Sequence, residues 1–344
     1  MKSYNIIDLK GKALSTSEAI EEAGINWNTT TGKSGVLTYD PYLNVERWKT
    51  IPSKKGVYRT DTQEPLGDCI VGQGFELVQN DEAFSIFDKI LSDSHAEFIS
   101  GGHFHNGASV FLQCKLPQTQ MFQNGDSTQR YLLISQGHTG QQALTMRFTH
   151  IRPSCYNTLV AALNDSNYFY SLRHTRNVRQ KIEQAVEFMK LGLGHLDKVE
   201  KRFNQFTTLK LSEEEQLNYL KLCYDRPIDS KIDDFNNWKN IEPIFLDARG
   251  KNFSEGTLWH PYNVVTEFED HHSRVNRPKG SRMNDAEWGQ EIHNHRRVRS
   301  MFAKGTVARK TKAFTLANDV AEGRLDLKSG KRLAPNTGFA AHVA

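Results

Sequence analysis

Hydrophobic and polar residues alternate through the middle of the chain, which is the pattern of strands that bury one face. Between 109 and 116 every second residue is apolar, and 131–136 form a second strand candidate. In the segment that follows the turn at 138–140, Leu144, Met146 and Phe148 alternate with polar residues. We therefore expect an antiparallel sheet, with its strands within about 97–150, and an α+β fold in which helices cover the sheet.

Helical patterns flank the predicted sheet on both sides. A short helix is expected over 15–24, where a serine precedes the apolar residues and a glycine follows them. The segment 25–66 is rich in Thr, Gly, Pro and Lys and predicts short strands and loops. A helix opens near Asn80, and another, capped by Ser154, is expected from about 155 to 163.

The part of the chain from about 175 to 270 is predicted to be mainly helical. A long apolar stripe runs from Val178 to Phe206 at helical spacing, and glycines at 192 and 194 interrupt it. This stripe predicts a helical hairpin that packs against the sheet or contacts another subunit. A further amphipathic helix is expected over 257–271.

The formal net charge of +4 is divided unevenly along the chain. Residues 1–270 carry 29 Lys/Arg and 34 Asp/Glu, whereas residues 271–344 carry 15 Lys/Arg and 6 Asp/Glu. We therefore divide the chain into a mixed core, 1–270, and a basic C-terminal extension, 271–344, with one short helix. Because basic segments attract polyanions, we expect non-specific DNA attraction, or contact with a neighbouring subunit, from Arg296, Arg297, Arg299, Lys304, Arg309 and Lys310.

Composition excludes several protein classes. No segment approaches the roughly 18–20 apolar residues of a membrane-spanning helix, and the polar N-terminal residues predict no secretory signal. The four cysteines are scattered without a Cys-x-x-Cys pair, so neither a zinc site nor a disulfide framework is expected. We expect a protein of the cytoplasm, the host's if a phage encodes it, with no cofactor and no membrane contact.

Basic and aromatic residues gather after the last predicted strand. Arg147 belongs to the strand face opposite Met146, and Arg152 precedes the predicted helix at 155, where free N–H groups favour an anion. Single-stranded nucleic acid is bound by basic groups that contact phosphates and by rings that stack on bases. The candidate DNA-binding residues are Arg147, Arg152, Arg173, His174, Arg176, Tyr168 and Tyr170. In the alternative hypothesis these arginines pair with carboxylates and the rings lie in the core.

His103-Phe104-His105 suggests a different chemistry. Two histidines separated by one residue on a strand project from the same face, and a His-hydrophobic-His triplet is typical of rolling-circle and relaxase nucleases. A metal-dependent nuclease would use His103 and His105 together with an acidic cluster or a tyrosine. The glycines on both sides of the triplet instead favour a turn with surface histidines.

Short segments spread along the chain resemble one protein family. They are Ala19–Trp27, Tyr58–Asp61, Leu66-Gly67, Gln79–Phe84, Gly137–Gly140, Arg152–Leu159, Arg173–Thr175, Asn263–Glu267 and Asp270-His271. In this order they resemble the phage- and plasmid-borne family called domain of unknown function 932, over roughly residues 15–320. The resemblance implies a mobile-element setting near recombination and replication genes. It favours comparison with proteins that anneal single strands in a basic groove without a catalytic residue.

From these observations we expect a DNA-binding protein rather than an enzyme. It would bind single-stranded DNA through phosphate contacts in phage or plasmid recombination or replication, and it would assemble as a homo-oligomer. Two alternatives belong to other classes: a metal-dependent nuclease, and a phage protein that acts on a host factor.

Overall fold

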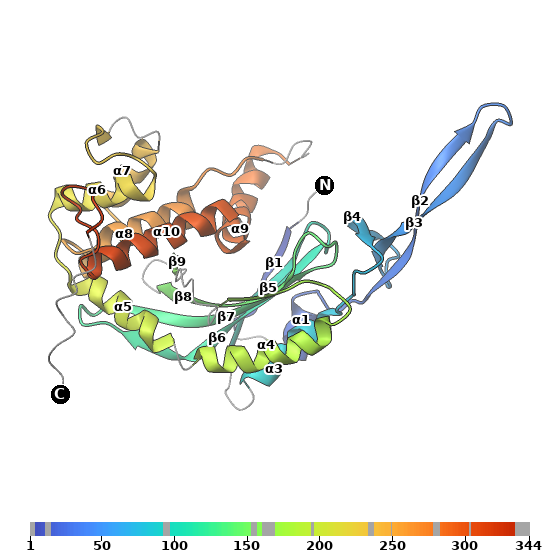
Figure 1. Cartoon of the computed structure of the whole chain (residues 1–344), viewed down its shortest axis with the longest axis horizontal. Coiled ribbons are helices and arrows are strands. Elements are labelled where there is room, and N and C mark those ends of the chain that lie inside the picture. The colour runs from blue at the N-terminus through green and yellow to red at the C-terminus, as the bar shows by residue number, and fades with distance from the viewer. Residues whose placement is uncertain are drawn as a thin grey trace.

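The structure, a computed structural model, describes most of the chain. The described residues are 4–10, 15–91, 97–152, 157–159, 169–193, 196–232, 237–248, 250–277, 283–302 and 304–333. An antiparallel sheet crosses the middle of the molecule, helices lie on both sides of it, and a long two-stranded arm projects from one end (Figure 1).

The main sheet confirms the α+β class. Its strand order is β1-β5-β6-β7-β8-β10, β9 also pairs with β8, and every pair is antiparallel. The bounds are β1 (Tyr4–Asp8), β5 (Glu97–Phe104), β6 (Ser109–Met121), β7 (Ser127–Gly137), β8 (Leu144–Arg152), β9 (Asn157–Leu159) and β10 (Phe169–Leu172).

The alternating apolar residues of β6, β7 and β8 lie on one buried face of the sheet, as the sequence predicts. Leu112 pairs with Ile134 and Ile134 with Met146, so these side chains share one face of the sheet, and all three are fully buried. Helices cover this face because their own apolar residues need burial. They are α1 (Thr16–Glu22), α2 (Asn80–Phe84), α3 (Ile86–Leu91), α4 (Val178–Leu193) and α5 (Leu196–Thr208) (Figure 1).

A second group of helices packs around a cluster of aromatic rings. It comprises α6 (Glu213–Cys223), α7 (Trp238–Leu246), α8 (Trp259–Glu267), a π-helical turn η4 (Phe268–His272), α9 (Asp285–Phe302) and α10 (Lys304–Ala321), with a 3-10 turn η3 (Lys251–Phe253) before α8. Phe203 of α5 lies 5.4 Å from Trp259, 6.0 Å from Tyr262 and 5.6 Å from Phe314, between ring centroids. Phe314 belongs to α10, so the predicted extension supplies part of the core.

Three expectations differ from the structure. Residues 271–344 contain α9 and α10, each of 18 residues, where one short helix was predicted. Asn157–Leu159 form a strand paired with β8, so a helix through these residues is wrong; 153–156 and 160–168 lie outside the described residues. The edge strands β1 and β10 were not predicted at all.

The arm is the largest difference. Strands β2 (Thr29–Asp40) and β3 (Val45–Arg59) form a hairpin of 12 and 15 residues, and β4 (Pro65–Gly72) pairs only with the root of β3. The root is fixed to α2 by Gln79, whose side-chain oxygen accepts from the Thr29 N–H at 2.8 Å while its amide donates to the Thr29 carbonyl at 2.9 Å. The sequence pattern indicated only short strands and loops in this part of the chain.

Across the described residues, none of the helices combines the length and the apolar character that crossing a membrane requires.

Candidate nucleic-acid interface

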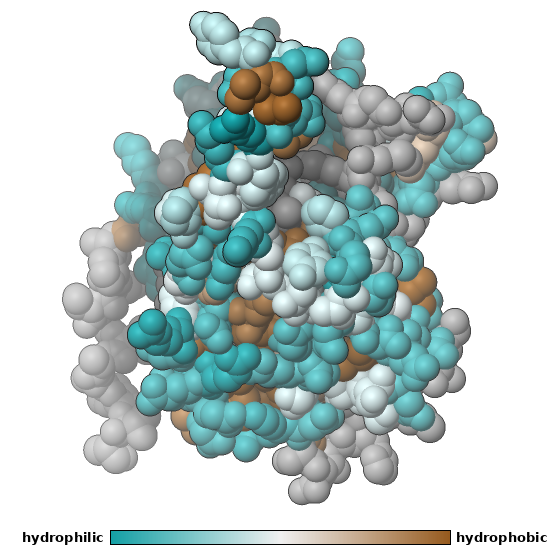
Figure 2. Space-filling model, turned by 90° about the vertical axis from the view of Figure 1, so that its right-hand side faces the viewer, coloured by the Kyte–Doolittle hydropathy of each residue, from teal (hydrophilic) through white to brown (hydrophobic). Residues whose placement is uncertain are grey.

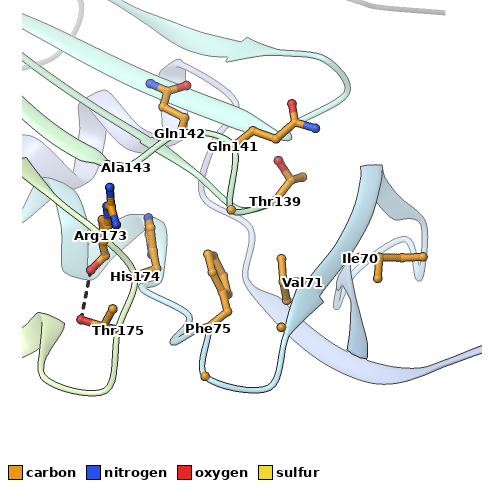
Figure 3. A pocket seen from close by; sticks show the side chains of 13 residues that line it. Ile70, Val71, Phe75, Thr139, Gln141, Gln142, Ala143, Arg173, His174 and Thr175 are labelled. Carbon is orange, nitrogen blue, oxygen red and sulfur yellow. Dashed lines mark hydrogen bonds between the residues drawn. The ribbon is translucent and has the colours of Figure 1, made fainter. Parts of the chain in front are cut away.

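An open cleft of about 760 Å³ lies where the arm meets the body. Three segments form it: the end of β4 with the loop after it, the turn between β7 and β8, and the residues that join β10 to α4 (Figure 3). Its lining is Ile70, Val71, Gly72, Gly74, Phe75, Thr139, Gly140, Gln141, Gln142, Ala143, Arg173, His174 and Thr175. The cleft therefore combines an apolar floor with amide, hydroxyl and guanidinium groups.

Phe75 and His174 form the centre of the floor. Their rings are stacked, with centroids 4.9 Å apart and planes inclined by 22°. Nδ1 of His174 lies 3.2 Å from the Glu76 carbonyl oxygen, and burial lowers the pKa of His174. Gly140 closes the turn above at a φ of +74°, where a Cβ would stand 3.7 Å from the Phe75 ring. A Cβ would fit at this distance, so the glycine is favoured by the positive φ of the turn rather than by lack of space.

A buried polar cluster supports the cleft from below. The Asn80 amide donates to the carbonyl oxygens of Ile25 and Trp27, and its own oxygen accepts from Gln136 and from Nε2 of His138, both at 2.9 Å. Burial lowers the pKa of His138 to about 3, so this ring is neutral at physiological pH. Segments that carry the family resemblance thus meet beneath one cleft although they are far apart in the sequence.

Two arginines on the cleft side are exposed. Arg173 lines the cleft and Arg176 follows it, and neither makes an ion pair with another residue in the described ranges. Arg179, one turn further on, is different because it contacts Glu76 at 2.9 Å and Glu82 at 2.7 Å. The first two guanidinium groups therefore remain available to an anionic ligand.

Lysines extend this basic character onto the arm. Lys33 pairs with Lys55, and Lys55 pairs with Val71, so the three side chains share one face of the small sheet. Val71 lines the cleft, so both lysines belong to the sheet face that carries this cleft residue, although neither lysine lines the cleft itself. Like charges directly opposite each other across two strands are unfavourable. A bound anion would relieve this repulsion.

A second cleft, of about 610 Å³, differs in its charge. It lies between α7 and α9 and is lined by Asp247 and Glu267 as well as by Lys239, Arg296 and His272. Because carboxylates and cations both line it, this cleft offers no preference for a polyanion. Nucleic-acid binding is therefore better supported at the first cleft.

The other predicted residues of the sheet region lie outside the cleft lining. Arg147 is half-buried on the second face of the sheet, and burial lowers its pKa. Tyr170 packs against Phe188 of α4, with ring centroids 5.4 Å apart. Arg152 ends β8 opposite Asn157 rather than preceding a helix, which removes the helix-terminus argument made for it. Tyr168 lies outside the described residues.

The C-terminal cluster is largely engaged within the protein. Lys310 has no exposed surface and lies 2.7 Å from Asp270, so its ammonium group is used in a buried ion pair and is not presented to a ligand. Arg309 contacts Asp225 at 2.9 Å and covers the Tyr224 ring. Nε of Arg296 lies 3.4 Å from the Ser273 carbonyl oxygen. For Arg297, Arg299 and Lys304, only the helical backbone is described.

The two histidines of the nuclease alternative occupy different environments. His103 is in β5, and burial together with the nearby Arg59 lowers its pKa. His105 follows the strand in a turn, with a φ of +57°. Among the described residues, no group of three or more His, Cys, Asp or Glu side chains could hold a metal ion. No observation here favours metal-dependent cleavage.

Sequence reasoning missed Lys33, Lys55 and Phe75. A usable signal was present: two Thr-, Val- and Lys-containing runs flank Asp40-Pro41 and Asn44, which are turn formers. A hairpin assigned on that basis would have placed Lys33 opposite Pro52, and the register shift between Lys33 and Gly35 moves its partner to Lys55.

A family model described as "Domain of unknown function (DUF932)" matches residues 69–313. This range is narrower than the roughly 15–320 expected from the resemblance, and it contains every residue of the cleft lining but not the hairpin of the arm. Neither a curated protein nor a solved structure matches the chain.

Proposed function

We propose that the chain, which belongs to the DUF932 family, binds single-stranded nucleic acid in the cleft and along the root of the arm. One observation carries the proposal: four basic side chains without ion-pair partners among the described residues, Arg173, Arg176, Lys33 and Lys55, adjoin a cleft whose floor is aromatic. DNA handled during phage or plasmid recombination or replication is the substrate that the family setting favours. The protein acts by binding, without a catalytic residue.

Different residues of the cleft contact the phosphates and the bases of the bound strand. Arg173 and Arg176 contact phosphates on one side, and Lys33 and Lys55 continue the phosphate path onto the arm. Between them, Phe75 offers a ring on which a base can stack. Gln141 in the turn above offers an amide group to base edges, whereas the Gln142 amide donates to Ser135 Oγ at 2.9 Å. Sequence-independent affinity therefore comes from the phosphates, and the ring contributes without selecting a base.

The floor favours a single strand over a duplex. In a duplex the bases are stacked and paired inside the helix, so their faces cannot reach Phe75. In a single strand one base can leave its neighbours and enter the cleft. We therefore expect duplex DNA of the same length to bind more weakly, through the basic rim alone.

A salt titration of oligonucleotide binding tests the proposal. The double variant Arg173→Ala/Arg176→Ala should reduce the slope of log affinity against log salt by about 1.4, since each single-strand phosphate contact contributes about 0.7. The matched control is Lys198→Ala/Lys201→Ala, which removes two exposed lysines of α5 at the other end of the molecule (Figure 1). Equal slopes for both double variants would overturn the site.

The host-factor alternative makes the opposite prediction. A protein that acts only on another protein should show no oligonucleotide affinity at physiological salt, whichever arginines are present. The same titration therefore distinguishes the two functions.

A further inference from the structure

We call residues 34–51, the outer part of the arm, the distal arm. Seven large apolar side chains of the distal arm are exposed. They are Val36, Leu37, Tyr39, Tyr42, Leu43, Val45 and Trp48. Figure 2 faces the arm, and hydrophobic atoms gather near its end at the top of the view. Exposed apolar patches of this kind mark interaction sites.

The distal arm also lacks the support that a hairpin needs. β4 pairs with β3 only between Lys54 and Tyr58, so the distal arm has two strands and no covering layer among the described residues. An isolated two-stranded hairpin is marginally stable in water. Pairing with a further strand would supply both backbone hydrogen bonds and a surface for the apolar side chains.

Neither edge of the distal arm pairs with a further strand among the described residues, but the β3 edge carries Glu46, Arg47 and Lys49 and is closed just beyond the distal arm, at residues 52–54. On the β3 edge, Pro52 has no N–H, and the Gln73 amide donates to the carbonyl oxygens of Pro52 at 2.8 Å and Lys54 at 3.2 Å. On the β2 edge, Gln79 occupies the root at Thr29, but no described residue pairs with the edge between 34 and 40. The β2 edge therefore presents unpaired backbone groups to a partner strand.

The charge of the distal arm argues against nucleic acid as its partner. Asp40 and Glu46 balance Arg47 and Lys49, so its net charge is zero, and Arg47 lies 3.8 Å from Asp40. Four of its seven exposed apolar side chains, Val36, Leu37, Leu43 and Val45, are aliphatic and cannot stack on bases. Trp48 has one side against Gly35, where an added Cβ would lie 2.5 Å from the indole. Polyanion attraction thus ends at Lys33 and Lys55.

We infer that β2 of one copy of this chain pairs with β2 of a second copy in antiparallel orientation, through residues 34–39. This run, Ser-Gly-Val-Leu-Thr-Tyr, carries no charge, so two copies can approach without repulsion. Lys33 precedes the run and Asp40 follows it, and antiparallel pairing brings each lysine toward the aspartate end of the other copy. The two hairpins form one four-stranded sheet, and the contact is closed and two-fold symmetric. Because the arm projects from the body, the two bodies remain apart (Figure 1).

The size of the protein in solution, measured by light scattering or sedimentation across micromolar to sub-millimolar concentrations, tests the inference. The unmodified chain should form a dimer in a concentration-dependent way. Leu37→Lys places a charge on the pairing edge, as edge strands do to avoid association, and should raise the dimer dissociation constant about 10-fold or more, equivalent to about 1.4 kcal/mol. The matched control Ser53→Lys adds the same charge to the β3 side and should leave the constant unchanged.

A shortened arm gives the second variant. Gly35 and Thr50 are cross-strand partners, so Asn-Gly can replace Val36–Lys49 as a two-residue turn while Lys33, Lys55 and the cleft remain. This chain should be monomeric. A monomeric unmodified chain, or a shortened chain of unchanged oligomeric size, would overturn the inference. If the unmodified chain is monomeric and shortening weakens oligonucleotide binding, the distal arm contacts nucleic acid instead.

These outcomes are independent of the proposed function. If the chain binds no oligonucleotide but dimerises through the arm, the pairing stands and the cleft proposal fails. If the chain binds oligonucleotide as a monomer, the cleft proposal stands and the strand pairing fails.

Discussion

The C-terminal helices and the root of the arm both contain many basic residues, but these residues have different surroundings. In the helices, Lys310 is buried against Asp270, and Arg309 and Lys312 both contact Asp225. At the root of the arm, Lys33 and Lys55 face each other, and no carboxylate of the described residues pairs with either. The first region uses its charges to hold the fold together, and the second leaves them for a ligand.

This difference shows why a count of charges along the chain is a poor guide to anion binding. The last 74 residues have a net charge of +9 and the first 270 one of −5, yet several of the cations in the last 74 residues pair with carboxylates from earlier in the chain. Attraction for a polyanion depends on the cations that keep no carboxylate beside them. Four predictions test this contrast, from the largest expected effect to the smallest.

Breaking the buried ion pair should have the largest effect. Lys310→Ala leaves the Asp270 carboxylate buried without its partner and should lower the free energy of unfolding by about 3–5 kcal/mol. Urea unfolding followed by circular dichroism measures the loss. The double variant Lys310→Met/Asp270→Leu should recover most of it, because two apolar side chains can replace a buried pair. A loss below about 1 kcal/mol for Lys310→Ala would mean that the pair is solvated.

The support beneath the cleft should make stability depend on pH. His138 has a pKa of about 3 in the folded protein because it is buried, against 6.5 in the unfolded chain. As pH falls below 6.5 the unfolded chain therefore takes up a proton that the folded protein does not, and between pH 7.5 and 5 the folded state should lose about 2 kcal/mol. His138→Gln should remove this contribution and keep those of His150 and His174, whose pKa burial also lowers, whereas His293→Gln, which changes an exposed histidine, should keep all of them. Identical pH profiles for the two variants would contradict the assignment.

Two matched double variants compare the basic residues at the root of the arm with those of the C-terminal helices. Lys33→Ala/Lys55→Ala should weaken oligonucleotide binding at low salt about 10-fold, because each phosphate contact supplies part of the affinity. Arg309→Ala/Lys312→Ala removes the same charge from the helical region and should change the affinity less than about 2-fold, since both side chains already contact Asp225. Fluorescence anisotropy measures the oligonucleotide affinity of both double variants. A larger loss of affinity in Arg309→Ala/Lys312→Ala would mean that the cations of the helices, rather than the lysines of the arm, attract the nucleic acid.

The smallest effect concerns the stability of the arm. Lys55→Thr removes one of two like charges that face each other and should stabilise the hairpin by about 0.2–1 kcal/mol. Lys54→Thr is the control, because Lys54 pairs with Gly72 rather than with a cation. Amide hydrogen exchange in the arm measures the difference. Equal protection in the two variants would show that the Lys33–Lys55 repulsion is already screened.

The sequence was sufficient to predict the central strands of the main sheet but not the arm, for a physical reason. In β8, Leu144, Met146 and Phe148 alternate because one face of the strand is buried. In the distal arm both faces are exposed, so no alternation develops and Thr, Gly and Lys obscure the strand. Helix propensity at 155–163 was overridden at 157–159 by pairing with β8.

The candidate site was predicted in part. Arg173, His174 and Arg176 lie at or beside the cleft, because they follow the last strand of the sheet and precede α4. The positions of Lys310 and Arg309 could not be predicted, because their partners Asp270 and Asp225 are 40 and 84 residues away along the chain. Local composition contains no information about such pairs.

The main sheet and the small sheet of the arm also differ in when they can form during synthesis of the chain. Asp40 pairs with Val45, and every other pair of the hairpin lies within one short stretch of chain, whereas Tyr4 of β1 pairs with Phe104. Contacts between nearby residues form fast, and distant ones must wait for the chain between them. A nascent chain can therefore carry a complete arm before its first strand has a partner, so the arm is the part of the molecule able to meet another chain earliest.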